Sequence, residues 1–395
     1  MKPRLRLWFI VAIAIFSISI FRGIRYPNLW SYSHYLFNYN YGFVKRALLG
    51  EVITHLPPVF SSYYAFFIIS LIIFLANVIL LGSIFKNIIA LDETALLGAT
   101  LIYLSSMAVV YFAHTIGYFD HIGLLILLLS LKIKTFSRKM LFLLPAFVIA
   151  LLLHEAIFII FFPVVFISLL LTAITEGNTA GHYVLLAIFT VIVSIETFFL
   201  SSATIAVHSA VEMRHSLEAL IGHPLRKTAF YVLFRNPQEN WILLKTYWSR
   251  ERTAFSLASS ALVFVPSLLI IHYPLFHMLK NAIRKQWFLG LAILAPLSPI
   301  LLFGMGWDIQ RWFALSLTLS FVMLAIVSSS PLATTTIPIR SSMTAIFVFM
   351  LFLNGASRVT LFDEYDVKQF PFPEHVEYIL KVLSEKRLLF EWPRF

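Results

Sequence analysis

Ionisable residues are scarce in this chain, and several lie inside or beside long apolar segments. A charge buried beside lipid costs at least about 2.5 kcal/mol on insertion scales, so such residues usually have a role. The sharpest pair is His154 and Glu155, in the middle of an apolar stretch. Burial there is expected to raise the pKa of the Glu155 carboxyl, which suits a general acid or base. The rival interpretation is a buried polar pair that fixes a turn between two helices.

Two further acids follow short polar turns. Asp308 and Arg311 stand at i, i+3 spacing, which puts them on one helix face where they can pair. Asp308 also fits the role of a helix N-cap, and so does Asp120. His121, next to Asp120, is either a functional group or a satisfied buried polar residue.

Basic and aromatic residues add candidates for binding. Lys45 and Arg46, within NYNYGFVKRALLGE, can hold a phosphate or diphosphate, since both donate charge-assisted hydrogen bonds. Alternatively, they anchor an interfacial helix to lipid headgroups. Trp307 and Trp312 are typical either of an interfacial belt or of a platform that stacks on a sugar ring. Two isolated acids, Glu51 and Glu196, complete the set of candidates.

Metal and thiol chemistry find little support in the sequence. Residues 154–158 read HEAIF, without the second histidine of a zinc-binding helix. Cysteine is absent, which excludes disulfides, thiolate catalysis and cysteine-based metal sites. We therefore expect no required cofactor, although a divalent metal ion is compatible with the candidate acids.

The elements that position these residues are membrane-spanning helices. Of 395 residues, 60% are hydrophobic and only 12% are charged, against about 25% charged in a soluble domain. The apolar runs extend over about 18–25 residues without strict alternation, which indicates helices rather than strands. The sequence predicts an all-α bundle of about ten or eleven spans in a single membrane domain, 1–395. The net charge of +11 lies between spans, where it sets topology or meets lipid, so we expect no nucleic-acid partner.

The topology follows from the distribution of basic residues. The start, MKPRLR followed by an apolar run, lacks a small-x-small cleavage site, which predicts an uncleaved first span with its N-terminus inside. The sequence then predicts a first outer segment at 22–58 with an interfacial helix near 43–56. A large outer loop is predicted at 208–253 and a C-terminal outer tail at 356–395.

Residues 140–173 decide whether the candidate residues share one face. As a single helix this apolar stretch would be roughly 50 Å long, against a hydrocarbon core of about 30 Å. Two short spans that meet at His154 and Glu155, or two half-helices, fit better. With that turn outside, Asp120, Glu155 and Asp308 all fall on the outer face. A single crossing would instead put Asp120 and Asp308 on opposite sides.

Four strings carry a resemblance to known proteins: YNYGFVKRALLGE, YFDHIG, LLHEAIFIIFFP and GWDIQRWF. Set among ten or eleven spans with one large outer loop, they resemble bacterial O-antigen and capsule repeat-unit polymerases. The chain is also similar to GT-C glycosyltransferases, which take sugars from polyprenyl phosphates. GT-C enzymes typically have an acidic residue soon after the first span. Here the first outer segment is basic until Glu51, a difference that favours the polymerases.

The resemblance implies glycosyl transfer at the periplasmic face of the bacterial inner membrane, from a polyprenyl-diphosphate-linked sugar to a saccharide acceptor. It implies that Glu155 or Asp308 acts as general base, with Asp120 as a further catalytic residue. Diphosphate binding falls to Lys45, Arg46 and Arg311, with His121 and His154 orienting sugar or phosphate. Other envelope-glycan assembly proteins are the implied partners. The alternatives are a flippase for a lipid-linked glycan, and a membrane acyltransferase that uses His154 or His121 as its base.

Overall fold

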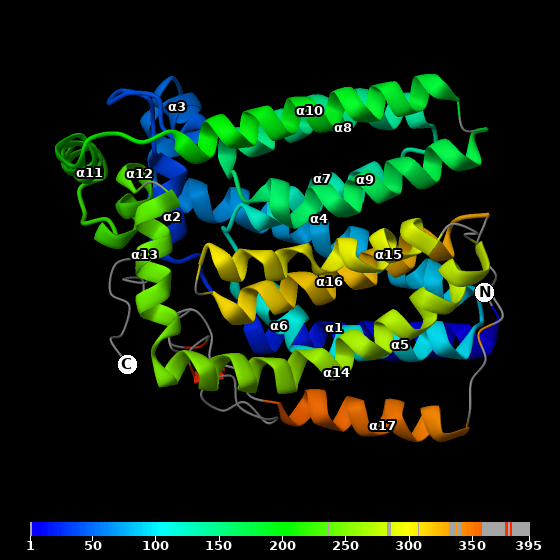
Figure 1. The fold of residues 1–395 in the computed structure, drawn as a ribbon. Helices are drawn as coiled ribbons and strands as arrows, with labels where there is room; N and C mark the ends of the chain where they lie inside the picture. The colour runs from blue at the N-terminus through cyan, green and yellow to red at the C-terminus, as the bar shows by residue number, and fades with distance from the viewer. Residues whose placement is uncertain are drawn as a thin grey trace.

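The computed structural model describes residues 2–357 apart from 178, 236, 283–285, 307, 332–336 and 338–340, together with residues 376, 377 and 380. Within these residues all regular structure is helical. Long helices run side by side in one bundle, and shorter helices cross one of its ends (Figure 1). This arrangement confirms the predicted all-α fold.

Seven helices in the described part of the chain are long and apolar enough to cross a membrane. They are α1 (Pro3–Gly23), α4 (Tyr63–Ala90), α8 (Phe136–Leu153), α9 (Ile157–Thr175), α10 (Ala180–Ser202), α14 (Glu251–Ala282) and α16 (Ile309–Ser328). The helices α5 (Thr94–Ser105) and α6 (Met107–His114) form an eighth span if their 43° bend is counted within one crossing. Three shorter apolar segments complete the bundle: α7 (Asp120–Ser130), α15 (Gln286–Leu294) continued by the 3₁₀ helix η3 (Ala295–Gly304), and α17 (Ser341–Ala356). Every predicted span therefore has a helical counterpart.

The helix α16 is the centre of the bundle. Most of its residues are buried, and it packs against α14, η3 and α6. The helices α1 and α10 instead expose Leu, Ile and Phe side chains along their outer faces. An apolar outer surface over buried polar groups is the pattern expected of a bundle that lipid surrounds.

Two adjacent serines mark the bend between α5 and α6. A break in a spanning helix frees backbone carbonyls, and each needs a partner where water is excluded. The buried side chain of Asn354, from α17, donates to the carbonyl of Ile102 and to Oγ of Ser105, both at 3.1 Å. This contact stabilises the bend, and the bent helix α6 then leads into the turn before Asp120.

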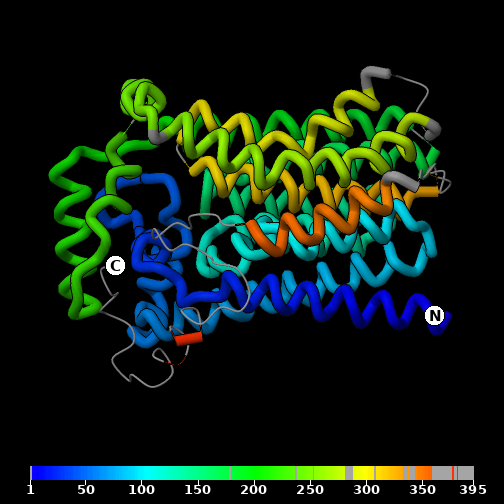
Figure 2. Tube along the Cα trace, turned by 90° about the horizontal axis from the view of Figure 1, so that it is seen from below, coloured from blue at the N-terminus to red at the C-terminus, as the bar shows by residue number. Residues whose placement is uncertain are grey.

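A second layer, which we call the cap, lies across the end of the bundle away from the N-terminus (Figures 1 and 2). Its helices are α2 (Leu29–Leu36), α3 (Leu48–Thr54), η1 (Pro58–Ser61), α11 (Val207–Ile221), η2 (Lys227–Phe230), α12 (Tyr231–Phe234) and α13 (Pro237–Trp248). The cap has its own hydrophobic cluster, around Tyr32, Phe37 and Phe230, separate from the core of the bundle. It is built from the two segments predicted as outer, 22–58 and 208–253, and α3 lies within the predicted helix at 43–56. Most of the predicted tail, 356–395, lies outside the described residues.

The apolar stretch at 140–173 forms two antiparallel helices rather than one. The helix α8 ends at Leu153, because the next residue, His154, has an extended backbone with φ −164° and ψ 110°. The helix α9 begins at Ile157 and runs back along α8. The prediction of a turn at His154 and Glu155 is therefore confirmed.

Candidate functional site

The turn between α8 and α9 presents its two polar residues to the underside of the cap. The backbone N–H of Ala156, the residue before α9, donates to Nδ1 of His154 at 3.1 Å, so this side chain stabilises the turn. Glu155 projects from the same turn toward the loop that precedes α3. The interpretation in which this polar pair fixes the turn between two helices therefore holds for Nδ1 of His154. The Glu155 carboxylate instead contacts a residue that is distant in the sequence.

Arg46 and Glu155 form a bidentate ion pair between the cap and the bundle. Nη2 of Arg46 lies 2.6 Å from Oε1 of Glu155, and Nε lies 2.9 Å from Oε2. Arg46 has a φ of +66°, a left-handed conformation that few non-glycine residues adopt. Such backbone outliers cluster at functional sites. The side chains of Arg46 and Glu155 keep 10% and 15% of their surface exposed, so a small part of the pair reaches the surface.

This ion pair overturns the expectation that the pKa of Glu155 is raised. Burial raises the pKa of the Glu155 carboxyl, but the charge and the two hydrogen bonds of Arg46 outweigh it. The net result is a pKa well below the usual range of a glutamate. Glu155 is therefore a weak base as long as Arg46 holds it.

Lys45 lies beside this pair and is buried. Its ammonium donates to the backbone carbonyl of Arg235 at 3.4 Å, a long contact that leaves other N–H groups for a ligand. Burial lowers the pKa of Lys45, and the neighbouring Glu155 charge opposes that shift. Lys45 and Arg46 thus present two adjacent cationic groups at the junction of cap and bundle.

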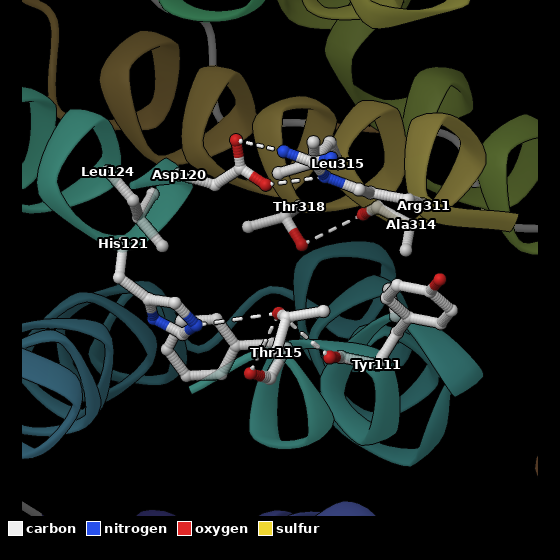
Figure 3. A pocket seen from close by; sticks show the side chains of 11 residues that line it. Tyr111, Thr115, Asp120, His121, Leu124, Arg311, Ala314, Leu315 and Thr318 are labelled. Carbon is white, nitrogen blue, oxygen red and sulfur yellow. Dashed lines mark hydrogen bonds and ion pairs between the residues drawn. The ribbon is translucent and has the colours of Figure 1, made fainter. Parts of the chain in front are cut away.

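A second bidentate pair lies within the bundle, where α7 and α16 begin. Nε and Nη2 of Arg311 donate to the two carboxylate oxygens of Asp120, at 2.7 and 2.9 Å (Figure 3). Nη1 of Arg311 also donates to Asp308 at 3.2 Å, which confirms the pairing predicted from the i, i+3 spacing. The side chains of Arg311 and Asp120 keep only 4% and 7% of their surface exposed. This pair is more deeply buried than the one between Arg46 and Glu155.

Asp308 is the least engaged of the three carboxylates. It stands at the N-cap position of α16, but its side chain makes no capping hydrogen bond and contacts Arg311 through one oxygen. Burial raises the pKa of Asp308, and the opposing charge of Arg311 does not fully compensate. With 21% of its side chain exposed, Asp308 is the carboxylate best placed to accept a proton from a bound molecule.

Three aromatic side chains, which the sequence reasoning missed, connect the two ion pairs. Tyr118 lies under the Arg311 guanidinium, 5.0 Å from its carbon to the ring centre. The ring of Trp30 stacks on Tyr118 at 5.6 Å and lies 3.9 Å from the ring of His34. His34 in turn faces Arg46, with 3.5 Å between Nδ1 and Nη1. The helix α2, which carries Trp30 and His34, has only eight residues and contains no acidic residue, lysine or arginine that would mark it as part of a site. The aromatic and histidine residues shortly before Lys45 are the signal that points to it.

The hydrogen bonds assign the proton of each site histidine. Nε2 of His34 lies 3.2 Å from the carbonyl of Ala229, so Nε2 carries the proton and Nδ1 faces Arg46 as an acceptor. In His154, Nδ1 accepts from Ala156, so the proton is again on Nε2. Burial, reinforced by the charge of Arg46, lowers the pKa of His34 well below its usual value and that of His154 to about 3. Both histidines are therefore neutral at pH 7, and no described residue accepts a hydrogen bond from Nε2 of His154.

His121 lies on the bundle side of Asp120, away from the cap. Its Nε2 lies 3.4 Å from Oγ1 of Thr115 (Figure 3). Its ring contacts Phe74 and Phe112. A cavity of about 20 Å³ separates these groups from Arg311, which is room for a water molecule. His121 is therefore a buried neighbour of Asp120, and it lines this cavity inside the bundle.

Of the four remaining candidates, Glu51 and Glu196 stand apart from the two ion pairs. Glu51 accepts from the backbone N–H of Tyr39 at 2.9 Å and pairs with His55, so it stabilises the fold of the cap. Glu196 lies on the partly exposed helix α10 and contacts none of the site residues among the described part of the chain. Trp312 is buried with Arg311 over its ring at 4.7 Å, so it supports the arginine and is closed to a sugar. Trp307 lies outside the described residues.

The charges of this site balance. The described part of the site contains three cations, Lys45, Arg46 and Arg311, and three carboxylates, Asp120, Glu155 and Asp308. Among the described residues, no cluster of three or more histidine and acidic side chains is arranged to hold a metal ion. The arrangement suits recognition of a polar, anionic molecule by guanidinium and ammonium groups.

Comparisons with known protein families, with curated protein sequences and with solved structures find no match for this chain. The fold and the site define a class: an α-helical, multi-pass membrane protein with a buried, charge-balanced site under a helical cap.

Proposed function

We propose that this protein is a membrane glycosyltransferase, of the kind that polymerises or extends envelope glycans, and that it acts on sugars linked to polyprenyl diphosphate. The observation that supports this proposal is the convergence of two arginine–carboxylate pairs from four distant segments at one end of an apolar bundle. Such a site can hold the charged headgroup of a lipid while the lipid tail stays beside the bundle. In this proposal the capped end faces the periplasm of a bacterium and the bundle lies in its inner membrane.

The cations take the role of holding the diphosphate. Arg46 and Lys45 are adjacent at the junction of cap and bundle, so they bind the diphosphate and stabilise the charge that it gains as the leaving group. Arg311 is fixed by Asp120 and by two aromatic rings, so it contributes a permanent positive field rather than a movable clamp. His154 offers the N–H of Nε2 to a sugar hydroxyl or a phosphate oxygen.

Asp308 takes the role of general base. Of the three acids, Asp120 has both oxygens bound by Arg311, and Glu155 has both bound by Arg46. Asp308 keeps one oxygen free of Arg311 and has a raised pKa, so it accepts a proton more readily than the other two. In the reaction it removes the proton of the acceptor hydroxyl as that oxygen attacks the anomeric carbon, and the diphosphate leaves with the bonding electrons.

The position of the site favours an enzyme over a flippase. Transporters typically bind their substrate near the midplane of the membrane, between broken helices. Here the charged residues lie at one end of the bundle, in loops or in the residues where α7, α9 and α16 begin. An acyltransferase is also less well supported, because His154 is committed at Nδ1 and His121 is enclosed by phenylalanines.

The test is a reaction with purified protein in lipid nanodiscs. A polyprenyl-diphosphate oligosaccharide is supplied, and the products are separated by mass. We expect longer saccharides and released polyprenyl diphosphate, with a loss of at least about a hundredfold in rate for Asp308→Asn, as is usual when a general base is removed. Glu51→Gln is the matched control, because it removes a carboxylate of the cap that lies outside the site. A substrate that stays chemically unchanged with wild-type protein would contradict a transferase and indicate transport.

A further inference from the structure

Glu155 lies where a ligand anion is expected. Its two oxygens occupy the two parallel N–H donors of Arg46, which is the geometry that a phosphate group would adopt on the same guanidinium. A diphosphate therefore cannot use the fork of Arg46 until Glu155 has left it. We propose that Glu155 is a built-in occupant of the anion site, that a diphosphate displaces it from Arg46, and that the released carboxylate then takes up a proton. This inference rests on the proposed function, and it describes how binding of the donor's diphosphate is controlled.

The two arginine pairs differ in a way that assigns the exchange to Arg46. Arg311 contacts two carboxylates and two aromatic rings, starts a central helix and is almost fully buried. Arg46 contacts one carboxylate, lies in a loop, and pairs with a residue in another loop. Only the second pair joins two separately packed parts, the cap and the bundle, so it can open without disturbing either hydrophobic core.

The charge balance explains why a proton must follow. With three cations and three carboxylates the site is neutral, so a diphosphate adds two or more uncompensated negative charges. The titratable and charged groups that face Glu155 are Lys45 and Arg46 from the loop before α3, His34 from α2, and His154 from its own turn. Once the diphosphate claims Lys45 and Arg46, the Glu155 carboxylate is buried beside a second anion and two neutral histidines. Both conditions favour its protonated form.

The exchange also has a use. Without donor, Glu155 neutralises Arg46 and stabilises the closed junction between cap and bundle. With donor, the same carboxyl becomes a neutral hydrogen-bond donor next to the diphosphate. The site therefore reaches its catalytic charge state only when the diphosphate group is present.

Calorimetry on the full-length protein in nanodiscs tests the proposal, with inorganic pyrophosphate and farnesyl diphosphate as the probes at pH 7.5. Because the isosteric Glu155→Gln removes the competing charge, we expect it to bind both probes about tenfold more tightly than wild type. Titrations in buffers of different ionisation enthalpy give the number of protons bound, and we expect Glu155→Gln to take up roughly one proton fewer per diphosphate. Tighter binding of farnesyl diphosphate than of pyrophosphate would assign the site to a lipid-linked anion, and equal binding would assign it to free diphosphate.

Matched variants separate this exchange from other effects. Glu51→Gln removes the same charge from the cap outside the site, and we expect its affinity and proton count to match wild type. Glu155→Asp is a second variant, too short to reach both Arg46 nitrogens, and it should also bind more tightly while it keeps the proton uptake. Unchanged or weaker binding by both Glu155 variants would overturn the proposed exchange and leave the diphosphate site standing. Failure of wild type and all variants to bind either probe would overturn the diphosphate site itself, and the proposed function with it.

Discussion

Asp120 and Arg311 lie 191 positions apart in the sequence and share two hydrogen bonds, at 2.7 and 2.9 Å, that join the first turns of α7 and α16. The guanidinium of Arg311 is at the same time covered by the rings of Tyr118 and Trp312. Planarity matters for each of these contacts, because a planar fork both pairs with a carboxylate and stacks on a ring. This residue therefore fixes the bundle side of the site.

The first prediction follows from that planarity. Arg311→Lys keeps the charge, but it loses the bidentate contact and both ring contacts, so we expect a loss of about 3 kcal/mol in the free energy of unfolding. Thermal unfolding in detergent measures it. Arg46→Lys is the comparison, and its loss should be smaller because the Arg46 pair is more exposed. Equal melting temperatures for Arg311→Lys and wild type would contradict the assigned role.

The second prediction concerns acid sensitivity. His154 has an ordinary pKa of 6.5 when unfolded and a pKa of about 3 in the folded protein, because burial and Arg46 disfavour its charged form. Below pH 6.5 the unfolded chain therefore binds a proton that the folded protein does not, so stability falls as the pH falls toward 3. Each pH unit well inside this window costs about 1.4 kcal/mol for this histidine.

Melting temperatures measured from pH 7.5 to 5 test this prediction. His154→Gln cannot titrate, so its melting temperature should fall less steeply with acid than that of wild type. The range stops above 4.5, the ordinary pKa of a glutamate, so that protonation of Glu155 in the unfolded state does not contribute. Parallel curves for the two proteins would refute the buried, neutral state of His154.

The third prediction concerns Gly50, in the motif that also contains Lys45 and Arg46. A Cβ atom at Gly50 would lie 2.0 Å from the backbone oxygen of Phe37, so α3 can rest on the end of α2 only if this residue has no side chain. Gly50→Ala should destabilise the cap by about 2 kcal/mol, as overpacking does. It should also weaken diphosphate binding, because the loop that holds Arg46 shifts with α3. Gly290→Ala is the control, since nothing lies within 4 Å of its Cβ position, and a helical alanine should leave stability equal or slightly higher.

The sequence predicts well the features that composition and length determine. The turn at His154 and Glu155 follows from an apolar run too long for one crossing, and the contact between Asp308 and Arg311 follows from helical spacing. Both are present in the structure. The sequence also predicts that most of the charged candidate residues gather at one end of the bundle, because each of them lies beside the end of a helix that faces that side.

The sequence alone does not predict which arginine pairs with which carboxylate. Nothing in a single sequence tells Arg46 to pair with Glu155, 109 positions away, or Asp120 to pair with Arg311. The expected pKa of Glu155 was wrong for this reason, since burial alone predicts a rise and the unseen arginine reverses it. The role of Trp30 was missed because its ring stacks on Tyr118, which comes from a distant segment that the sequence does not pair with α2.

The fourth prediction is the orientation of the bundle, on which the proposed periplasmic location of the site depends. The cap and the N-terminus lie at opposite ends of the bundle (Figure 1). The orientation of the bundle therefore determines on which side of the membrane each of them lies. Because the chain has no native cysteine, single cysteines report cleanly on exposure. Ser216→Cys and Thr246→Cys, on exposed positions of α11 and α13, should react with a membrane-impermeant maleimide on intact cells. Lys134→Cys, exposed at the opposite end, should react only after permeabilisation, since basic loops stay inside. The reverse pattern would put the charged site in the cytoplasm, where no periplasmic glycan could reach Asp308.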